Sequence, residues 1–93
     1  MTESPYDIAW TGLSRRALAR LPEKVGTAVI EFCYGALAEN PQRVGKALKL
    51  DLEGLHSARR GDFRVVYRID EAGRRVEIVA IDHRADVYRP GGR

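Results

Sequence analysis

The clearest pattern along the chain is an alternation of apolar and polar positions in its second half. Residues 63–69 alternate through Phe63, Val65, Tyr67 and Ile69, and a run rich in β-branched residues follows at 76–81. A period of two predicts strands that bury one face, and the turn-forming residues at 61–62 and 71–73 predict the turns between them. From residue 55 onward we therefore expect a three-stranded antiparallel meander.

The first half of the chain carries helical periodicity instead. A short helix is predicted to begin at a capping residue, Thr11 or Ser14, and to end before Pro22. A second helix starts at Pro22 and ends at Asn40-Pro41, because the residue before a proline is pushed out of helical geometry. Its apolar stripe consists of Val25, Val29, Phe32, Cys33, Ala36 and Leu37. Together these segments predict a helical hairpin.

The remaining segments complete the predicted order of elements. The aromatic and β-branched residues at 6–10 favour a strand, and residues 41–54 show no clean period, which indicates a basic loop with room for a short strand. Strand, two helices and three strands predict an α+β fold with both helices on one sheet face. At 93 residues the chain suits a single domain, 1–93.

Composition restricts the class of protein. The chain is 44% hydrophobic and 31% charged, without an apolar run long enough for a membrane span, which is typical of a soluble globular protein. Its first residues lack the features of a secretory signal, so we expect a cytoplasmic protein. The single Cys33 cannot form an internal disulfide, and its place in the helical stripe favours a buried, inert thiol.

Charge is distributed unevenly. Residues 1–40 hold four Lys/Arg against five Asp/Glu, whereas residues 41–93 hold twelve against eight. A basic C-terminal half favours an anionic partner, either nucleic acid or an acidic protein segment, although a solvated basic surface gives the same count.

The meander predicts which arginines lie on the face away from the helices. A two-residue turn at 72–73 places Arg68 opposite Glu77, a favourable cross-strand pair. The same register predicts Arg64 opposite Ile81, with His83 on the Arg64 side of the sheet.

The turn at Gly61-Asp62 predicts Arg59 directly opposite Arg64, an unfavourable pair of like charges that a bound anion would relieve. Alternative explanations are that both arginines are solvated, or that Arg64 pairs with Asp62 or with a C-terminal carboxylate. His83 also fits a surface histidine at a strand end.

These residues carry a family resemblance. The segment LHSARRGDFRVVYRID at 55–70, followed by HRADVYR at 83–89, resembles the RelE toxins of the RelE/ParE toxin superfamily. Leu21-Pro22 and the basic connection at 40–46 fall in the family's order. The resemblance implies a RelE-like fold and the toxin of a type II toxin–antitoxin system. RelE-branch members generally cut mRNA in the ribosomal A site, which implies a ribosome-dependent endoribonuclease that needs no metal or cofactor.

In that chemistry the ribose 2′-hydroxyl attacks the adjacent phosphodiester, and the protein positions the message, moves protons and neutralises the phosphate. Arg64 matches the arginine of the family's Gly-Asp-Phe-Arg motif and is assigned to phosphate stabilisation. Arg84 matches a second family arginine that would clamp the same phosphate. Tyr88 matches a C-terminal family tyrosine that stacks on a base or assists proton transfer; a lid over the sheet edge is its structural alternative.

The chain departs from the family at one strand. Several members carry lysines at the positions that are approximately Leu55 and Ser57 here. The nearby substitutes are His56, His83, Arg59 and Arg60, and of these we expect His83 to be the better acid–base candidate, because imidazole titrates near neutrality. The residues expected to contact RNA are Arg59, Arg60, Lys46, Lys49 and His56. The two lysines are more commonly solvated than functional, and the facing of His56 depends on an uncertain turn.

The resemblance also implies a partner, a cognate antitoxin with an acidic or amphipathic segment, so the toxin would form a hetero-oligomer with it. Two alternatives to the nuclease remain. The ParE branch of the superfamily inhibits DNA gyrase on the same scaffold. A catalytically silent RNA-binding module would also fit a chain that lacks the family lysines.

Overall fold

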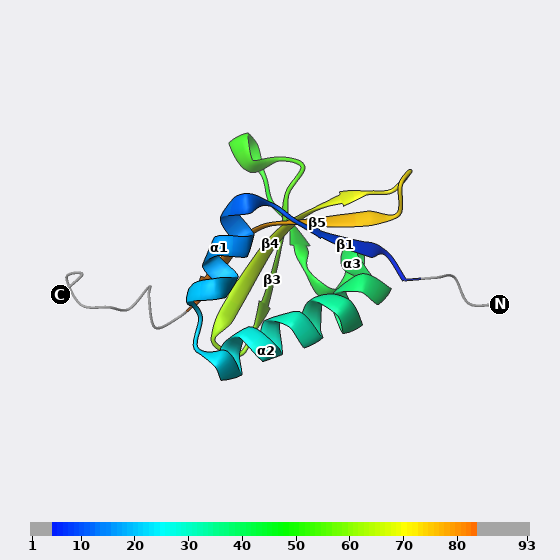
Figure 1. Cartoon of the computed structure of the whole chain (residues 1–93). Coiled ribbons are helices and arrows are strands. Elements are labelled where there is room, and N and C mark those ends of the chain that lie inside the picture. Colours follow the sequence, from blue (N-terminus) through cyan, green and yellow to red (C-terminus); the bar gives the residue numbers. More distant parts are fainter. Residues whose placement is uncertain (1–4, 84–93) are drawn as a thin grey trace.

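The computed structural model describes residues 5–83, which form a five-stranded sheet backed by a helical hairpin (Figure 1). The α+β prediction is confirmed. The elements follow the order β1 (Asp7–Trp10), α1 (Gly12–Arg20), α2 (Glu23–Phe32), the π-helical turn η1 (Cys33–Leu37), α3 (Pro41–Val44), β2 (Lys46–Ala47), the 3₁₀ turn η2 (Leu50–Leu52), β3 (His56–Arg60), β4 (Phe63–Asp70) and β5 (Arg75–His83).

The sheet has the strand order β1-β5-β4-β3-β2. The predicted meander is confirmed as the antiparallel run β3-β4-β5, and the short strand allowed for in the basic connection is β2, which pairs with β3. The N-terminal strand β1 pairs in parallel with β5, the last strand of the meander, and so lies at the opposite edge of the sheet from β2. As a result β5 lies between the first strand of the chain and β4 (Figure 1).

The core lies between the sheet and the helical hairpin. Its fully covered side chains come from α2 and its π-helical extension on one side and from β4 and β5 on the other; they are Val29, Cys33, Leu37, Val65, Tyr67, Val76 and Ile78. Burial raises the pKa of the Cys33 thiol to about 12. A thiol with this pKa stays protonated at neutral pH, and the predicted burial of Cys33 is confirmed. No helix among residues 5–83 has the length and apolar character needed to span a membrane.

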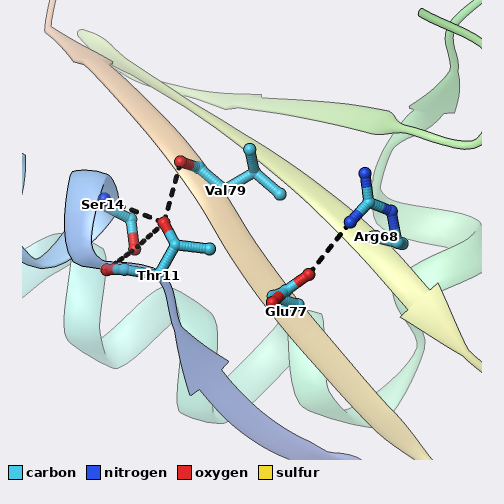
Figure 2. A network of polar contacts seen from close by, with 5 residues as sticks. All are labelled: Thr11, Ser14, Arg68, Glu77 and Val79. Atoms are coloured by element: carbon cyan, nitrogen blue, oxygen red, sulfur yellow. Dashed lines mark hydrogen bonds and ion pairs between the residues drawn. The ribbon is translucent and has the colours of Figure 1, made fainter.

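The start of α1 is fixed by a small network of hydroxyl groups. Thr11 is the N-cap, and its hydroxyl oxygen accepts a hydrogen bond from the Ser14 amide at 3.1 Å. The Thr11 hydroxyl lies 3.1 Å from the carbonyl oxygen of Val79 in β5, to which it donates (Figure 2). The buried Ser14 hydroxyl donates to the Thr11 carbonyl at 3.0 Å. One threonine thus both caps a helix and ties it to the sheet.

Replacing Thr11 with valine is expected to lower the free energy of unfolding by about 1–2 kcal/mol, because valine keeps the shape but loses the cap and the bond to Val79. Urea denaturation followed by circular dichroism measures the change. Thr27→Val, an isosteric change at an exposed position of α2, is the matched control. Equal stability of the two variants would contradict this role of Thr11.

The connection before β3 contains a backbone conformation that its residue disfavours. Leu50 has φ of 62° and its side chain is 87% exposed, in the η2 turn that projects from the molecule (Figure 1). A left-handed conformation costs an ordinary residue about 1–2 kcal/mol, and asparagine adopts it more readily.

Leu50→Asn is therefore expected to raise the free energy of unfolding by about 0.5–1 kcal/mol, since little apolar burial is lost. Thermal denaturation gives the readout. Leu52→Asn changes an exposed leucine in the same turn whose φ is not positive, so it should bring no gain. A gain of the same size from Leu52→Asn would show that strain at Leu50 is not the cause.

The β4-β5 register differs from the regular hairpin predicted from the sequence. Arg68 lies opposite Glu77 as expected, with an ion pair of 3.1 Å (Figure 2). Beyond this point β5 contains a bulge at Val79, so Arg64 lies opposite Asp82 and not opposite Ile81. The prediction for Arg64 was wrong because it assumed strict alternation along β5.

The spacing of buried residues in β5 explains the bulge. Ile78 and Ile81 are both buried, although three residues apart they would point to opposite faces of a regular strand. The extra residue at Val79 returns Ile81 to the helix side, where it pairs with Val65. The bulge therefore buries one more isoleucine and moves Asp82 to the other face.

Candidate functional site

A row of charged side chains crosses the sheet face opposite the helices, which we call the open face. Arg59 of β3 lies opposite Arg64 of β4, as the sequence predicted, and Arg64 lies opposite Asp82 of β5. All three residues are exposed. Directly opposed residues share a face, with Cβ atoms about 5 Å apart. Arg59, Arg64 and Asp82 therefore form one continuous row, named here the charged row.

Arginines in the charged row are available to a ligand. Within residues 5–83, the ion pair on the open face joins Arg68 and Glu77, and none engages Arg64 or Asp82. Guanidinium groups remain protonated and present several donors in a planar fork that fits phosphate oxygens. Two such groups facing each other attract an anion, because the anion removes their mutual repulsion. The charged row can thus bind a phosphate.

One of the predicted lysines extends this surface. Lys46 of β2 lies opposite Ser57, which lies opposite Val66, so the lysine belongs to the open face one row away from Arg59. Lys46 is exposed at the edge of the sheet. Lys49 is also exposed but precedes the η2 turn, outside the sheet. The open face therefore gathers Lys46 with the arginines and leaves Lys49 apart.

Two other predicted RNA contacts lie on the helix side. Arg60 pairs with Phe63, and its guanidinium lies 4.5 Å from the centre of the Phe32 ring, a cation–π contact with α2. His56 pairs with Tyr67 and stacks on it with ring centres 5.5 Å apart. Both side chains therefore lie on the other face of the sheet from Arg59, and their contact with RNA stays a prediction.

The expected position of His83 was also wrong. His83 lies opposite Phe63 and so projects to the helix side, whereas Arg64 projects to the open face. The physical reason is again the bulge at Val79, which reverses the facing of every later residue of β5 relative to β4. Arg84 and Tyr88 lie outside the described residues, so their assignments stay predictions.

Tyr67 is a structural group and not a proton donor for a reaction. Its hydroxyl donates to the Pro41 carbonyl at 2.6 Å, and the side chain is fully covered. Burial raises the pKa of Tyr67 to about 12. The phenol therefore stays protonated at neutral pH and holds α3 against the sheet.

The residue that sequence reasoning missed is Asp82. A regular hairpin assigns it to the helix side, and only the bulge brings it beside Arg64. The available signal was the spacing of Ile78 and Ile81, since two isoleucines three apart in a strand require an irregularity if both are buried.

Comparison with known proteins agrees with the fold and the motifs. Residues 8–88 match the family model for the ParE toxin of type II toxin–antitoxin systems, parDE. The chain is 55% identical over 87 residues to toxin RelE of Mycobacterium tuberculosis, covering 94% of this chain and 90% of that protein. It is 48% identical over 85 residues to toxin RelG of the same organism, covering 91% and 98% respectively.

Solved structures extend the likeness to three dimensions. The RelBE2 toxin–antitoxin complex of M. tuberculosis contains a chain with a TM-score of 0.87 and 46% identity, covering 91% of this chain and 98% of that one. The isolated RelE toxin of Escherichia coli shares the fold, with a TM-score of 0.69 at 13% identity and coverage of 94% and 95%. With the family motifs and the sheet topology in agreement, the chain belongs to the RelE/ParE family of type II toxin–antitoxin toxins, as a RelE-like toxin.

Proposed function

We propose that this toxin is an endoribonuclease that cleaves mRNA on translating ribosomes. The observation that supports it most is the pair Arg59 and Arg64, opposed on the open face and engaged by no ion pair within residues 5–83. An RNA backbone supplies the anion that such a pair favours. A ribosomal target also implies that the toxin acts in the cytoplasm.

The roles of the arginines follow from the charge that develops during cleavage. When the 2′-oxygen attacks phosphorus, negative charge grows on the non-bridging phosphate oxygens. Arg64, central in the charged row, donates hydrogen bonds to these oxygens, and Arg59 adds a second cation at the same phosphate. Arg84 and Tyr88 keep the roles that the family resemblance implies, a second clamp and a base-stacking or proton-transferring phenol.

Mapping of message ends tests the proposal. Purified toxin is added to ribosomes translating a defined message, and new 5′ ends are located by primer extension. We expect cuts that require both toxin and ribosomes. The same message without ribosomes is the control for free ribonuclease activity. An intact message at every toxin concentration would refute the nuclease.

A partner protein belongs to the same proposal. The similar M. tuberculosis chain was solved within a toxin–antitoxin complex. The basic C-terminal half of the present chain, residues 41–93, suits an acidic or amphipathic antitoxin segment. We therefore expect a cognate antitoxin to bind and silence the toxin. Co-expression of the neighbouring reading frame with tagged toxin, followed by purification and size measurement, tests for a stable complex.

The description of the matching family model favours one alternative target, because it names ParE toxins. A gyrase supercoiling assay distinguishes the two activities. Inhibition of supercoiling without new message ends would assign the toxin to the gyrase inhibitors. Message cleavage without any effect on supercoiling would support the nuclease.

A further inference from the structure

Phosphate binding explains the two arginines of the charged row but not its acidic member, Asp82. Asp82 lies directly opposite Arg64 on the open face, is exposed, and forms no ion pair within residues 5–83. A carboxylate beside a phosphate-binding arginine weakens the binding of an anion there. Its position is therefore unfavourable for binding alone, and a role in the reaction would explain it. The following inference rests on the proposed nuclease function.

Cleavage by a 2′-hydroxyl places a strict demand on the proton acceptor. The attacking oxygen belongs to the nucleotide whose own phosphate is broken, so it lies within a few ångströms of the phosphorus. A general base must reach that oxygen at about 2.6–3.2 Å. The base must accordingly project from the same face as Arg64 and from a position next to it.

Few described side chains meet this demand. Arg59, on the other side of Arg64, carries a guanidinium group that has donors but no acceptor. The residues of the adjacent row on β4 and β5, Val66 and Ala80, are apolar. Glu77 lies on the same face two rows away from Arg64, and Arg68 holds it in an ion pair of 3.1 Å.

The histidines do not replace the carboxylate. His83 follows Asp82 directly and therefore projects to the helix side of the sheet. His56 also lies on the helix side, where it stacks on Tyr67. Among the charged groups of strands β3, β4 and β5, Asp82 alone combines the right face, the right neighbour and a carboxylate outside any ion pair of residues 5–83.

We propose that Asp82 is the general base of the cleavage reaction. Its carboxylate accepts the proton of the 2′-hydroxyl as the bond from the 2′-oxygen to phosphorus forms. The bond from phosphorus to the 5′-oxygen breaks, and the leaving oxygen takes a proton from water. The products are a 2′,3′-cyclic phosphate and a 5′-hydroxyl, with no change in oxidation state. Arg64, on the neighbouring strand, stabilises the phosphate that both bonds share.

The test separates proton transfer from binding. Asp82→Asn keeps the shape of the side chain but removes its basicity and its charge. Two quantities are measured with programmed ribosomes: the single-turnover cleavage rate, and the affinity for a message that carries a 2′-deoxynucleotide at the mapped cut site and cannot be cut. We expect cleavage about 10²-fold slower and affinity equal or tighter, since a negative charge beside the phosphate is gone. Asp82→Glu should recover part of the rate.

Asp51→Asn, which removes an exposed carboxylate in the η2 turn, is the matched control and should change neither quantity. Cleavage by Asp82→Asn as fast as wild type would overturn the assignment of the base while leaving the nuclease intact. So would a slow variant whose unfolding midpoint or affinity falls in parallel, because that result indicates a structural role. Failure of the wild-type toxin itself to cut would instead refute the proposed function.

Discussion

Arg64→Ala is expected to lower the cleavage rate on programmed ribosomes by about 10³-fold while leaving the free energy of unfolding nearly unchanged. The rate falls because the substitution removes the central donor to the phosphate oxygens, where negative charge grows in the transition state. Stability is preserved because the side chain is exposed on the open face and no ion pair within residues 5–83 involves it. Single-turnover kinetics and urea denaturation measure the two effects.

Arg68→Ala provides the matched control for this result. It removes a guanidinium from the same strand and the same face, but one that is paired with Glu77. This exposed pair contributes at most about 1 kcal/mol, and the variant should keep its cleavage activity. Arg64→Lys should recover only part of the lost rate, since lysine keeps the charge without the planar fork. Equal losses from Arg64→Ala and Arg68→Ala would show that overall charge, rather than the charged row, determines activity.

Gly45→Ala is expected to lower the free energy of unfolding by about 3 kcal/mol. A methyl group at this position would overlap the Tyr67 hydroxyl and lie 2.8 Å from the Ser57 carbonyl oxygen. Neither neighbour moves easily: Tyr67 is fully covered and bonded to Pro41, and Ser57 belongs to β3. Overpacking of a well-filled interior typically costs about 1–3 kcal/mol, and a backbone neighbour puts this site at the upper end.

A double-mutant cycle with Tyr67→Phe tests the cause. Removing the hydroxyl relieves one of the two overlaps, so the double variant should lose less than the sum of the single changes. Gly35→Ala is the control, because a methyl group there meets nothing within 4 Å. Additive losses in the cycle, measured by urea denaturation, would exclude the Tyr67 hydroxyl as the obstacle.

The sequence predicts the elements of this fold better than their irregularities. Alternation in residues 63–69 and the turn at Gly61-Asp62 correctly predicted the face and the partner of Arg64 on β3. Both signals are local, because the side chains that define them are neighbours along one hairpin. The parallel pairing of β1 with β5 joins segments almost seventy residues apart, and no local pattern specifies it.

Only the β3 side of the candidate site, where Arg59 faces Arg64, was predicted correctly, because it depends on a local turn. Its β5 side depends on one extra residue at Val79, which reverses His83 and Asp82 together. Arg60 shows a second limit: its charge suggested RNA, but its place on the helix side gives it an aromatic ring as its partner. A count of charges describes only composition. The sheet face on which a charged side chain lies depends on packing against residues that are distant in the sequence.

The position of β5 has a consequence for the synthesis of the toxin. This strand is the last of the described elements along the chain, yet it lies second in the sheet, between β1 and β4. During translation β1 has no partner strand, and β4 has only β3, until residues 75–83 leave the ribosome, so both the core and the charged row stay incomplete until then. Formation of the sheet and of the charged row therefore depends on the last strand of the described chain.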